Sequence, residues 1–297
     1  MSRSDPARGI RFVLLAVAFF AFQDGISKHL AAHYPVPFFV MIRYWFFAAF
    51  VVALAARSPG GLRAAPVTAM PVIQVIRGVL LVAQILVIVT SFDLVGLATT
   101  QAIFALHPLL ATLLAIPVLG EAVGWRRLAA VGVGFAGVLV ILRPGTGVFD
   151  PDTLIALLAA GMFAVYGVLT RMTSRADGSG APAFFYTGVA GAAAITLVGP
   201  FHWTPMTVPD MGWLALLCVT GMSGHYCLIR ALDATEAVRI QPFIYLQMVL
   251  AMGVGALVFG ETVDATAIVG VAMIIGAGLY AIWREARALR RAGAASG

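Results

Sequence analysis

Long apolar runs separated by short polar gaps fill the whole chain. A helix needs about 20 apolar residues to cross a bilayer core, and helices of this kind are expected at 11–31, 38–56, 72–92, 96–118, 126–143, 152–172, 182–200, 210–230, 236–259 and 264–284. The gaps are rich in Pro and Gly, which are typical of turns, and none is long enough for a soluble domain. The pattern predicts an all-α polytopic membrane protein with ten transmembrane helices.

One part of this pattern occurs twice. The stretch 96–121 (GLATTQAIFALHPLLATLLAIPVLGE) aligns without a gap with 236–261 (EAVRIQPFIYLQMVLAMGVGALVFGE), and both copies close with Gly-Glu. More loosely, Lys28 ends the first expected helix as Arg171 ends the sixth. Identity between two parts of one chain indicates an internal duplication.

The duplication divides the chain into two five-helix units, expected at 1–147 and 148–297. Because five is odd, the second unit starts on the opposite side of the membrane, and a pseudo-two-fold axis in the membrane plane relates the two units. Inverted repeats of this kind are typical of secondary transporters, whose substrate sites lie near the midplane where the repeats meet.

Composition and charge support this interpretation. The chain is 61% hydrophobic and 11% charged, with a mean hydropathy of +0.98, which excludes a soluble globular protein. The net charge of +6 comes from basic residues in the gaps between apolar runs, so they indicate topology and no nucleic-acid partner is expected. With both termini in the cytoplasm, 15 of the 19 Lys and Arg face inward and only Lys28 and Arg143 face outward.

In each unit, one helix ends in Gly-Glu and is followed by a Gly-rich helix (GEAVGWRRLAAVGVGFAG and GETVDATAIVGVAMIIGAG). Two five-helix copies with these features resemble the drug/metabolite transporter superfamily in its ten-helix form with paired EamA repeats. The resemblance covers nearly the whole chain. It implies a bacterial inner-membrane transporter that exports small metabolites, amino acids including aromatic ones above all. A multidrug or nucleotide-sugar-type transporter of the same fold is the alternative within this resemblance.

Several polar residues fall near the middle of expected helices. They are Gln84, His107, His225 and Gln247, and the repeat alignment places His107 on Gln247. Polar groups within a bilayer usually face the bundle interior or a wet cavity, so this set is expected to contact a small-molecule substrate. The alternative is hydrogen bonding between helices, which contributes about 0.6 kcal/mol per contact on average.

Two tyrosines inside helices, Tyr166 and Tyr245, lie away from the interfaces where Tyr usually collects. An aromatic cavity with a few polar contacts suits an amino acid or a flat organic solute. A lipid-facing stripe is the alternative.

Gln23 and Asp24 are further candidate substrate ligands, and Asp24 lies far from the expected ends of its helix. Asp24 either titrates with protons or forms an ion pair or a hydrogen bond near the outer interface, for example with Lys28, which is four residues further along the helix. Arg43 and Arg77 also lie within expected helices. They could bind a substrate carboxylate, neutralise acidic residues at 233 and 236, or reach an interface.

Two carboxylates and three prolines carry structural expectations. Glu121 and Glu261 each follow a Gly, so each is expected to cap the amino terminus of the next helix. Pro108, Pro117 and Pro242 interrupt helices and are hinge candidates.

One motif favours a different class of protein. Residues 221–224 (GMSG) match the GxSG pattern of intramembrane serine proteases, with Ser223 as nucleophile and His107 or His225 as base. A Gly-rich helix produces this tetrad by chance, so the chain is not expected to be an enzyme. It has no P-loop, dinucleotide motif or metal cluster, and therefore no expected cofactor or metal. The expected partners are a small molecule and the lipid bilayer, with the chain a monomer or a weak homodimer.

Overall fold

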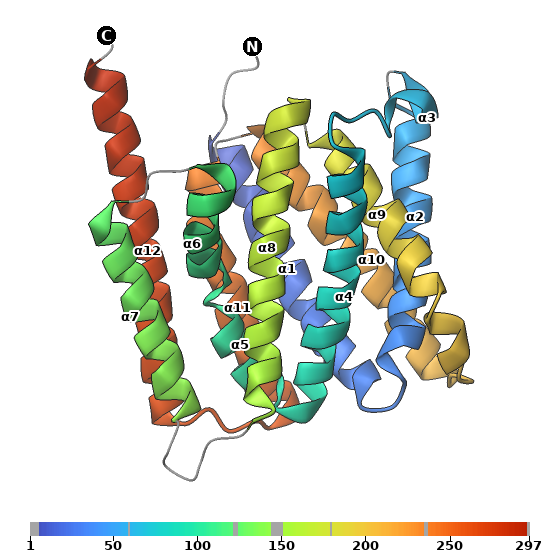
Figure 1. Cartoon of the computed structure of the whole chain (residues 1–297). Coiled ribbons are helices and arrows are strands. Elements are labelled where there is room, and N and C mark those ends of the chain that lie inside the picture. Colours follow the sequence, from blue (N-terminus) through green and yellow to red (C-terminus); the bar gives the residue numbers. More distant parts are fainter. Residues whose placement is uncertain are drawn as a thin grey trace.

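The computed structural model is a bundle of long helices that run between two ends of the molecule (Figure 1). It describes residues 6–58, 60–120, 124–143, 151–178, 180–234 and 237–295. Both chain termini lie at one end of the bundle, which we call the terminal end, and the opposite end is the far end.

The elements in chain order are α1 (Pro6–Ala31), α2 (Val36–Ala56), α3 (Gly61–Ala64), α4 (Pro71–Leu94), α5 (Leu97–Phe104), α6 (His107–Leu119), α7 (Trp125–Leu142), α8 (Thr153–Asp177), α9 (Ala181–Thr196), the 3₁₀ turn η1 (Gly199–His202), α10 (Val208–Ala234), α11 (Ala237–Phe259) and α12 (Ala265–Ala295). In the described residues, seven helical spans are long and apolar enough to cross a membrane, and three further apolar helices are shorter. The chain is thus an all-α polytopic membrane protein.

The expected helix at 96–118 is broken into α5 and α6. Ala105 and Leu106 form a turn, and Pro108 stands in the first turn of α6. Proline lacks the N–H that would bond to the preceding turn, but it is tolerated at a helix start, where that N–H has no intrahelical partner. The hinge expected at Pro108 therefore coincides with a real break. The side chain of Pro242 lies outside the described residues, although the backbone there is helical.

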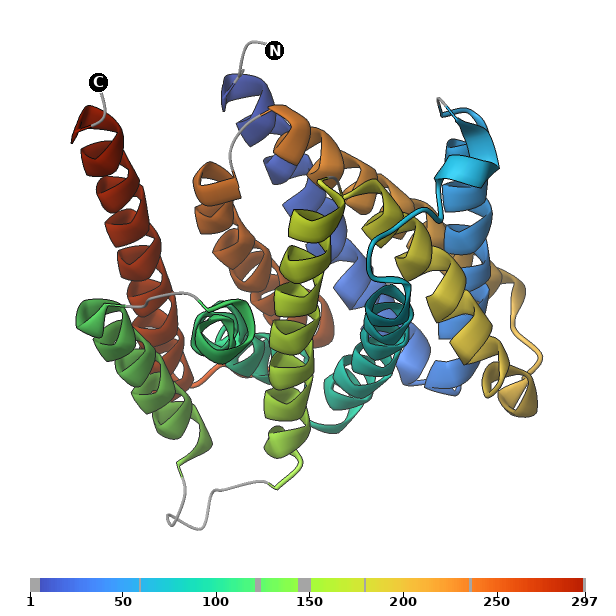
Figure 2. The same cartoon turned by 45° about the horizontal axis from the view of Figure 1, so that its top comes forward.

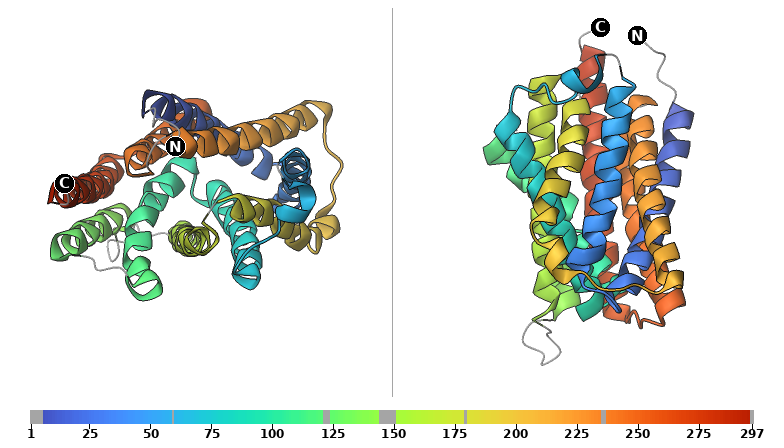
Figure 3. Two further views of the ribbon diagram at one scale, coloured as in Figure 1. Left: turned by 90° about the horizontal axis from the view of Figure 1, so that it is seen from above. Right: turned by 90° about the vertical axis from the view of Figure 1, so that its right-hand side faces the viewer.

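The two halves run in opposite directions. α1 leaves the terminal end and α8 returns to it (Figure 1). α1 packs along α10 and α11, whereas α8 packs along α4, α5 and α6. The first helix of each expected unit thus packs against helices of the other unit. Viewed along the bundle, α12, α11, α1 and α10 form one row and α7, α6, α8 and α4 another (Figure 3).

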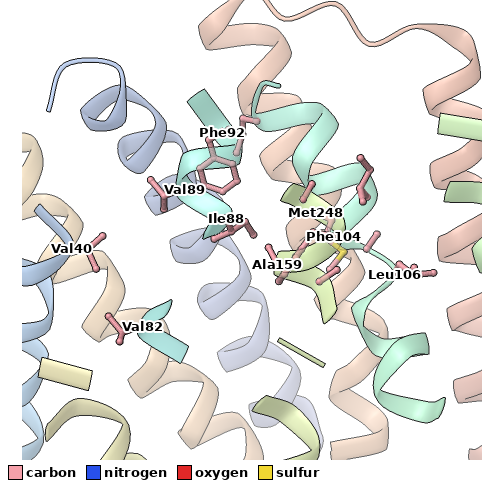
Figure 4. Close-up of a cluster of buried hydrophobic side chains, with 14 of the residues drawn as sticks. Val40, Val82, Ile88, Val89, Phe92, Phe104, Leu106, Ala159 and Met248 are labelled. Carbon is pink, nitrogen blue, oxygen red and sulfur yellow. The ribbon is translucent and has the colours of Figure 1, made fainter. Parts of the chain in front are cut away.

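The core between the rows is apolar. Phe92 of α4, Phe104 of α5, Ala159 of α8 and Met248 of α11 are all buried and lie close together in the close-up (Figure 4). Dispersion contacts of this kind hold helices together in a bilayer, where lipid already satisfies apolar surface.

α7 and α12 pair along one edge of the bundle (Figure 2). A Cβ atom on Gly137 would lie 2.7 Å from the carbonyl oxygen of Gly270, so only glycine allows this approach. The pair agrees with the close contact expected of small residues in membrane helices.

Candidate functional site

A narrow cavity lies halfway along the bundle, between α2, α4 and α10. We call it the central cavity, and its volume is about 20 Å³, room for about one water molecule. Its walls are Arg43, Tyr44, Phe47, Leu81, Ile85, Cys218, Gly221, Met222 and His225. The cavity therefore combines one guanidinium, one phenol and one imidazole with apolar walls.

Aromatic rings form one side of the central cavity. The His225 ring stacks on Phe47, with centroids 5.4 Å apart and planes 17° apart, and meets Phe20 edge to face at 5.1 Å. Gly224 makes this possible, because a Cβ atom there would lie 2.7 Å from the Phe20 ring. These rings give the cavity an aromatic wall, a surface against which a flat ring packs well.

Two polar groups of α2 in this cavity are incompletely satisfied. Nη2 of Arg43 donates a hydrogen bond to Oε1 of Gln23 at 3.2 Å, and within the described residues no carboxylate lies within 4 Å of the guanidinium. The Tyr44 hydroxyl is buried and, in the described part of the chain, has no hydrogen-bond partner. Sequence reasoning did not single out Tyr44; its position beside Arg43 was the available signal.

A larger cavity of about 240 Å³ lies in the half of the bundle towards the terminal end. We call it the terminal cavity. It is walled by α6, α8, α11 and α12 through His107, Pro108, Leu109, Ala111, Thr112, Phe163, Gly167, Val168, Arg171, Ile244, Tyr245, Gly278, Ala281 and Ile282. Both halves of the chain contribute, and two of the expected substrate ligands, His107 and Tyr245, meet here.

The orientation of His107 is fixed by its own backbone and by rings. Nδ1 lies 3.0 Å from the Phe104 carbonyl oxygen, which can only accept, so Nδ1 carries the proton and Nε2 of the neutral ring is an acceptor. The ring also contacts Phe104 and Phe163, with centroids 4.7 Å and 4.8 Å away. His107 thus offers the terminal cavity an acceptor in an aromatic setting.

Tyr245 lies on the opposite wall. Its hydroxyl is buried without a hydrogen-bond partner among the described residues. The phenol rests directly on Gly278 of α12, where any side chain would overlap it. The seam between α11 and α12 therefore holds an unsatisfied donor, which is costly in a low-dielectric interior.

Asp24 lies on α1 and contacts α5 and α11. Its Oδ2 accepts hydrogen bonds from Nε2 of Gln101 at 2.9 Å and from Nε2 of Gln247 at 3.4 Å. Asp24 thus forms hydrogen bonds, one of its expected interactions, but the pairing with Lys28 is wrong, because Lys28 forms an ion pair with Glu261. The local spacing allowed the first pair, but α11 brings a second carboxylate to Lys28.

Glu261 joins the two halves at the far end. Its carboxylate accepts hydrogen bonds from the backbone N–H of Leu97 at 2.8 Å and of Ala98 at 2.7 Å, the first turn of α5. It also pairs with Lys28 of α1. We call this set the far seam. The expected cap of the following helix is therefore wrong for Glu261: it caps α5 of the other half, and Asp264 caps α12 by accepting from the Ala267 N–H at 2.8 Å. Glu121 lies outside the described residues.

Arg77 and Tyr166 bind each other. The Arg77 guanidinium donates to the Tyr166 hydroxyl at 3.0 Å, to Thr170 at 3.2 Å, to Gln74 at 3.1 Å and to the Ala183 carbonyl. Arg77 thus ties α4 to α8 and α9 through neutral acceptors. The acidic residues at 233 and 236, its expected partners, lie outside the described side chains.

The remaining candidates are placed as follows. Gln84 is buried on α4. Gln23 approaches the central cavity through Arg43, and Gln247 reaches only Asp24. Among the described residues, Ser223 makes no hydrogen bond with His107 or His225, whose rings pack on aromatic side chains, so the geometry gives the protease alternative no support.

Comparisons with known proteins agree with one another. The model of the EamA-like transporter family matches residues 7–143 and 152–283. A curated S-adenosylmethionine uptake transporter of Rickettsia prowazekii (strain Madrid E) is 28% identical over 284 residues, 95% of this chain and 94% of that protein. A riboflavin transporter of Brucella anthropi is 27% identical, over 85% and 91% of the two chains. A solved crystal structure with 19% identity has a TM-score of 0.62 and covers 93% of this chain and 98% of that chain, which shows the same fold.

Proposed function

Because this chain belongs to the EamA-like transporter family, a family of transporters and not of enzymes, we propose that it moves a small amphipathic metabolite with a planar ring across the bacterial inner membrane by alternating access. The terminal end faces the cytoplasm in this proposal, as the distribution of Lys and Arg favours.

The central cavity is the observation that carries the proposal. It lies midway along α2, α4 and α10, with elements of both halves in its wall, where transporters built from inverted repeats bind their cargo. The stacked faces of Phe47 and His225 suit a flat ring, and Arg43 supplies one fixed positive charge. Its small volume corresponds to an occluded chamber that must widen to admit a cargo.

The contrast between the two ends supports alternating access. At the far end, Glu261 binds Lys28 and the first turn of α5. In the terminal half, His107 and Tyr245 border the larger cavity. We propose that cargo reaches the central cavity from the terminal side once that cavity widens, and through the far seam in the alternate conformation.

The relatives suggest what the cargo is. S-adenosylmethionine, the substrate in the name of the Rickettsia relative, has an adenine ring, a sulfonium and an amino acid group, which fit an aromatic slot with mixed polar contacts. Amino acids, including aromatic ones, share the head group, and their export is the second candidate. A nucleotide sugar is less suited, because its phosphates call for several converging cations, and among the described residues Arg43 is the guanidinium that lines this cavity.

Flux into liposomes tests the function. Purified protein should take up labelled S-adenosylmethionine faster than empty liposomes do, and unlabelled compound on the opposite side should accelerate the exchange. Labelled riboflavin, phenylalanine and tryptophan are measured in the same way. Absence of flux for all of them would contradict the proposed cargo class. Repeating the assay with an imposed pH gradient separates proton coupling, for which Asp24 and the histidines are candidates, from downhill flux.

A further inference from the structure

We propose that Arg43 and Tyr44 form a subsite in the central cavity that binds the carboxylate of the cargo. This inference rests on the proposed function and deepens it, since it names the chemical group that the site recognises. The alternatives for the same two residues are a purely structural role and binding of a neutral acceptor.

The first support is the incomplete satisfaction of Arg43. A guanidinium has five N–H donors, and in the described structure Arg43 uses one of its nitrogens, Nη2, on Gln23. A cation inside a bilayer is expensive unless it is paired or solvated. Arg77 shows the contrast, because its guanidinium is bound by two side-chain hydroxyls, an amide and a backbone carbonyl. Arg43 therefore has the capacity to bind an anion, and Arg77 does not.

The second support is the Tyr44 hydroxyl. The side chain is 2% exposed, its hydroxyl has no partner among the described residues, and it lines the same cavity as Arg43. A buried donor without a partner is unfavourable. A carboxylate oxygen at this position would accept from the hydroxyl while its other oxygen accepts from the guanidinium.

Asp24 does not serve as this anion in the structure. It interacts electrostatically with Arg43 but lies beyond salt-bridge distance, and its Oδ2 is held by Gln101 and Gln247. The site thus keeps a positive charge facing the cavity, with an acidic group nearby on α1 that could contact a cargo amine. The positive charge of Arg43 and the acidic group of Asp24 are complementary to the carboxylate and the amine of an α-amino acid.

Arg43 lies close enough to the rings of Phe47 and His225 for one cargo molecule to contact all three. Arg43 and Phe47 are four residues apart on α2, so their Cβ atoms lie about 5–6 Å apart on one face of the helix. A carboxylate at Arg43 therefore places the rest of the molecule one helical turn away, against Phe47 and His225. Aromatic amino acids span such a distance directly, and S-adenosylmethionine does so in a folded conformation.

Matched pairs of probes test the subsite. S-adenosylmethionine is compared with decarboxylated S-adenosylmethionine, and phenylalanine with phenethylamine; in each pair the second compound lacks only the carboxylate. Wild-type protein should prefer the carboxylate compound by about tenfold or more in KM. Arg43→Gln should remove this preference by weakening only the carboxylate compound. Tyr44→Phe, which keeps the ring and its packing, should weaken the same compound by about threefold to tenfold.

Controls separate the possible outcomes. Arg143→Gln removes a cation that pairs with Asp264 away from both cavities and should leave the preference unchanged. If Arg43→Gln does not fold, the isosteric Tyr44→Phe variant decides. An equal change for both members of a pair, or an unchanged KM for the carboxylate compound in a folded variant, would overturn the subsite while transport itself stands. No flux of any probe in wild type would instead reject the proposed function.

Discussion

The two ends of the bundle are held together by different chemistry. The far seam is charged and closed: Glu261 binds Lys28 and two backbone N–H groups of α5. The terminal half is lined by rings and surrounds a cavity of about 240 Å³, with the Tyr245 hydroxyl left without a partner among the described residues. Among the described residues, the far end thus shows a charged contact and the terminal half shows a cavity lined by rings.

The repeat alignment makes this difference informative. More loosely, it also matches Lys28 at the end of α1 with Arg171 on α8. In the described residues, Arg171 lines the terminal cavity and Lys28 pairs with Glu261 in the far seam. In an alternating-access transporter, the two repeats exchange conformations, so that the end that was open closes and the other end opens.

The largest effect is expected from Glu261→Ala. It removes the partner of Lys28 and leaves the Leu97 and Ala98 N–H groups without an acceptor, a loss of about 2–3 kcal/mol for the closed far seam. Ser27 is buried on α1 beside Lys28. The variant Ser27→Cys, in a background where Cys218 and Cys227 are replaced by Ala, reports the opening of the far seam. Its labelling by an impermeant maleimide from the far side should rise at least tenfold. Asp264→Asn, which weakens the pairing with Arg143 and leaves the contacts of Glu261 in place, should leave labelling unchanged; equal labelling in the two variants would contradict the role of Glu261.

Gly96→Ala should weaken the same seam somewhat less. Gly96 has φ +89°, and a Cβ atom there would lie 2.9 Å from Oε1 of Glu261, so strain and a clash combine to cost about 2 kcal/mol. Gly120 is the matched control, because it has φ +65° but nothing within 4 Å of a Cβ atom. Thermal unfolding of the purified variants should show a clearly greater loss for Gly96→Ala. Equal losses would mean that Glu261 does not need the space that glycine leaves.

Gly278→Ala tests the terminal cavity. The added methyl group would overlap the Tyr245 phenol and push it from its place, so transport should fall about tenfold, which corresponds to about 1.4 kcal/mol. Gly276→Ala, two residues earlier on α12, meets nothing within 4 Å and should transport normally. Identical flux in Gly278→Ala and Gly276→Ala would show that the position of Tyr245 does not affect transport.

His107→Ala should lower transport by up to about tenfold without lowering the amount of folded protein in the membrane. The acceptor that Nε2 offers to the terminal cavity is lost, whereas the apolar packing around the ring is only loosened. His107→Phe, which keeps the ring contacts, should show the same loss. A fully active His107→Ala variant would return this residue to a packing role.

The smallest effect concerns Asp264. Hydrogen bonds, first from Arg143, hold its pKa below the usual range. A carboxylate with a depressed folded pKa contributes stability above its unfolded pKa of about 4, and this contribution is lost as pH falls through the folded pKa. The difference in thermal stability between wild type and Asp264→Asn should therefore be constant from pH 6 to 8 and shrink below about pH 4. A difference that grows on acidification would contradict this pairing.

Hydropathy and the duplication were sufficient to predict the helices. The expected ends at 31, 56 and 259 coincide with the ends of α1, α2 and α11, because apolar length and turn residues are local properties of the chain. The break between α5 and α6 was signalled by Pro108. The precise starts of α8 and α9 differ by one residue from the expected ones, within the usual uncertainty of helix ends.

The partners of polar side chains could not be predicted in the same way. Lys28 was expected to meet Asp24 because spacing along one helix favours that pair, but the far end of α11 presents Glu261 to it. Arg77 meets Tyr166 and Thr170 because α8 crosses into the first half. Such pairings depend on which helices the repeats exchange, and periodicity within one helix contains no information about that.

Cross-linking the far seam tests alternating access most directly. Lys28→Cys with Glu261→Cys, in a background without the native cysteines, is joined by a reducible bifunctional thiol reagent in liposomes. The flux of labelled S-adenosylmethionine should stop and return after reduction. The matched pair Arg143→Cys with Asp264→Cys joins α7 to the start of α12, which pack as one scaffold, and should leave flux unchanged. Undiminished flux through protein whose far seam is fully cross-linked would contradict transport through this end.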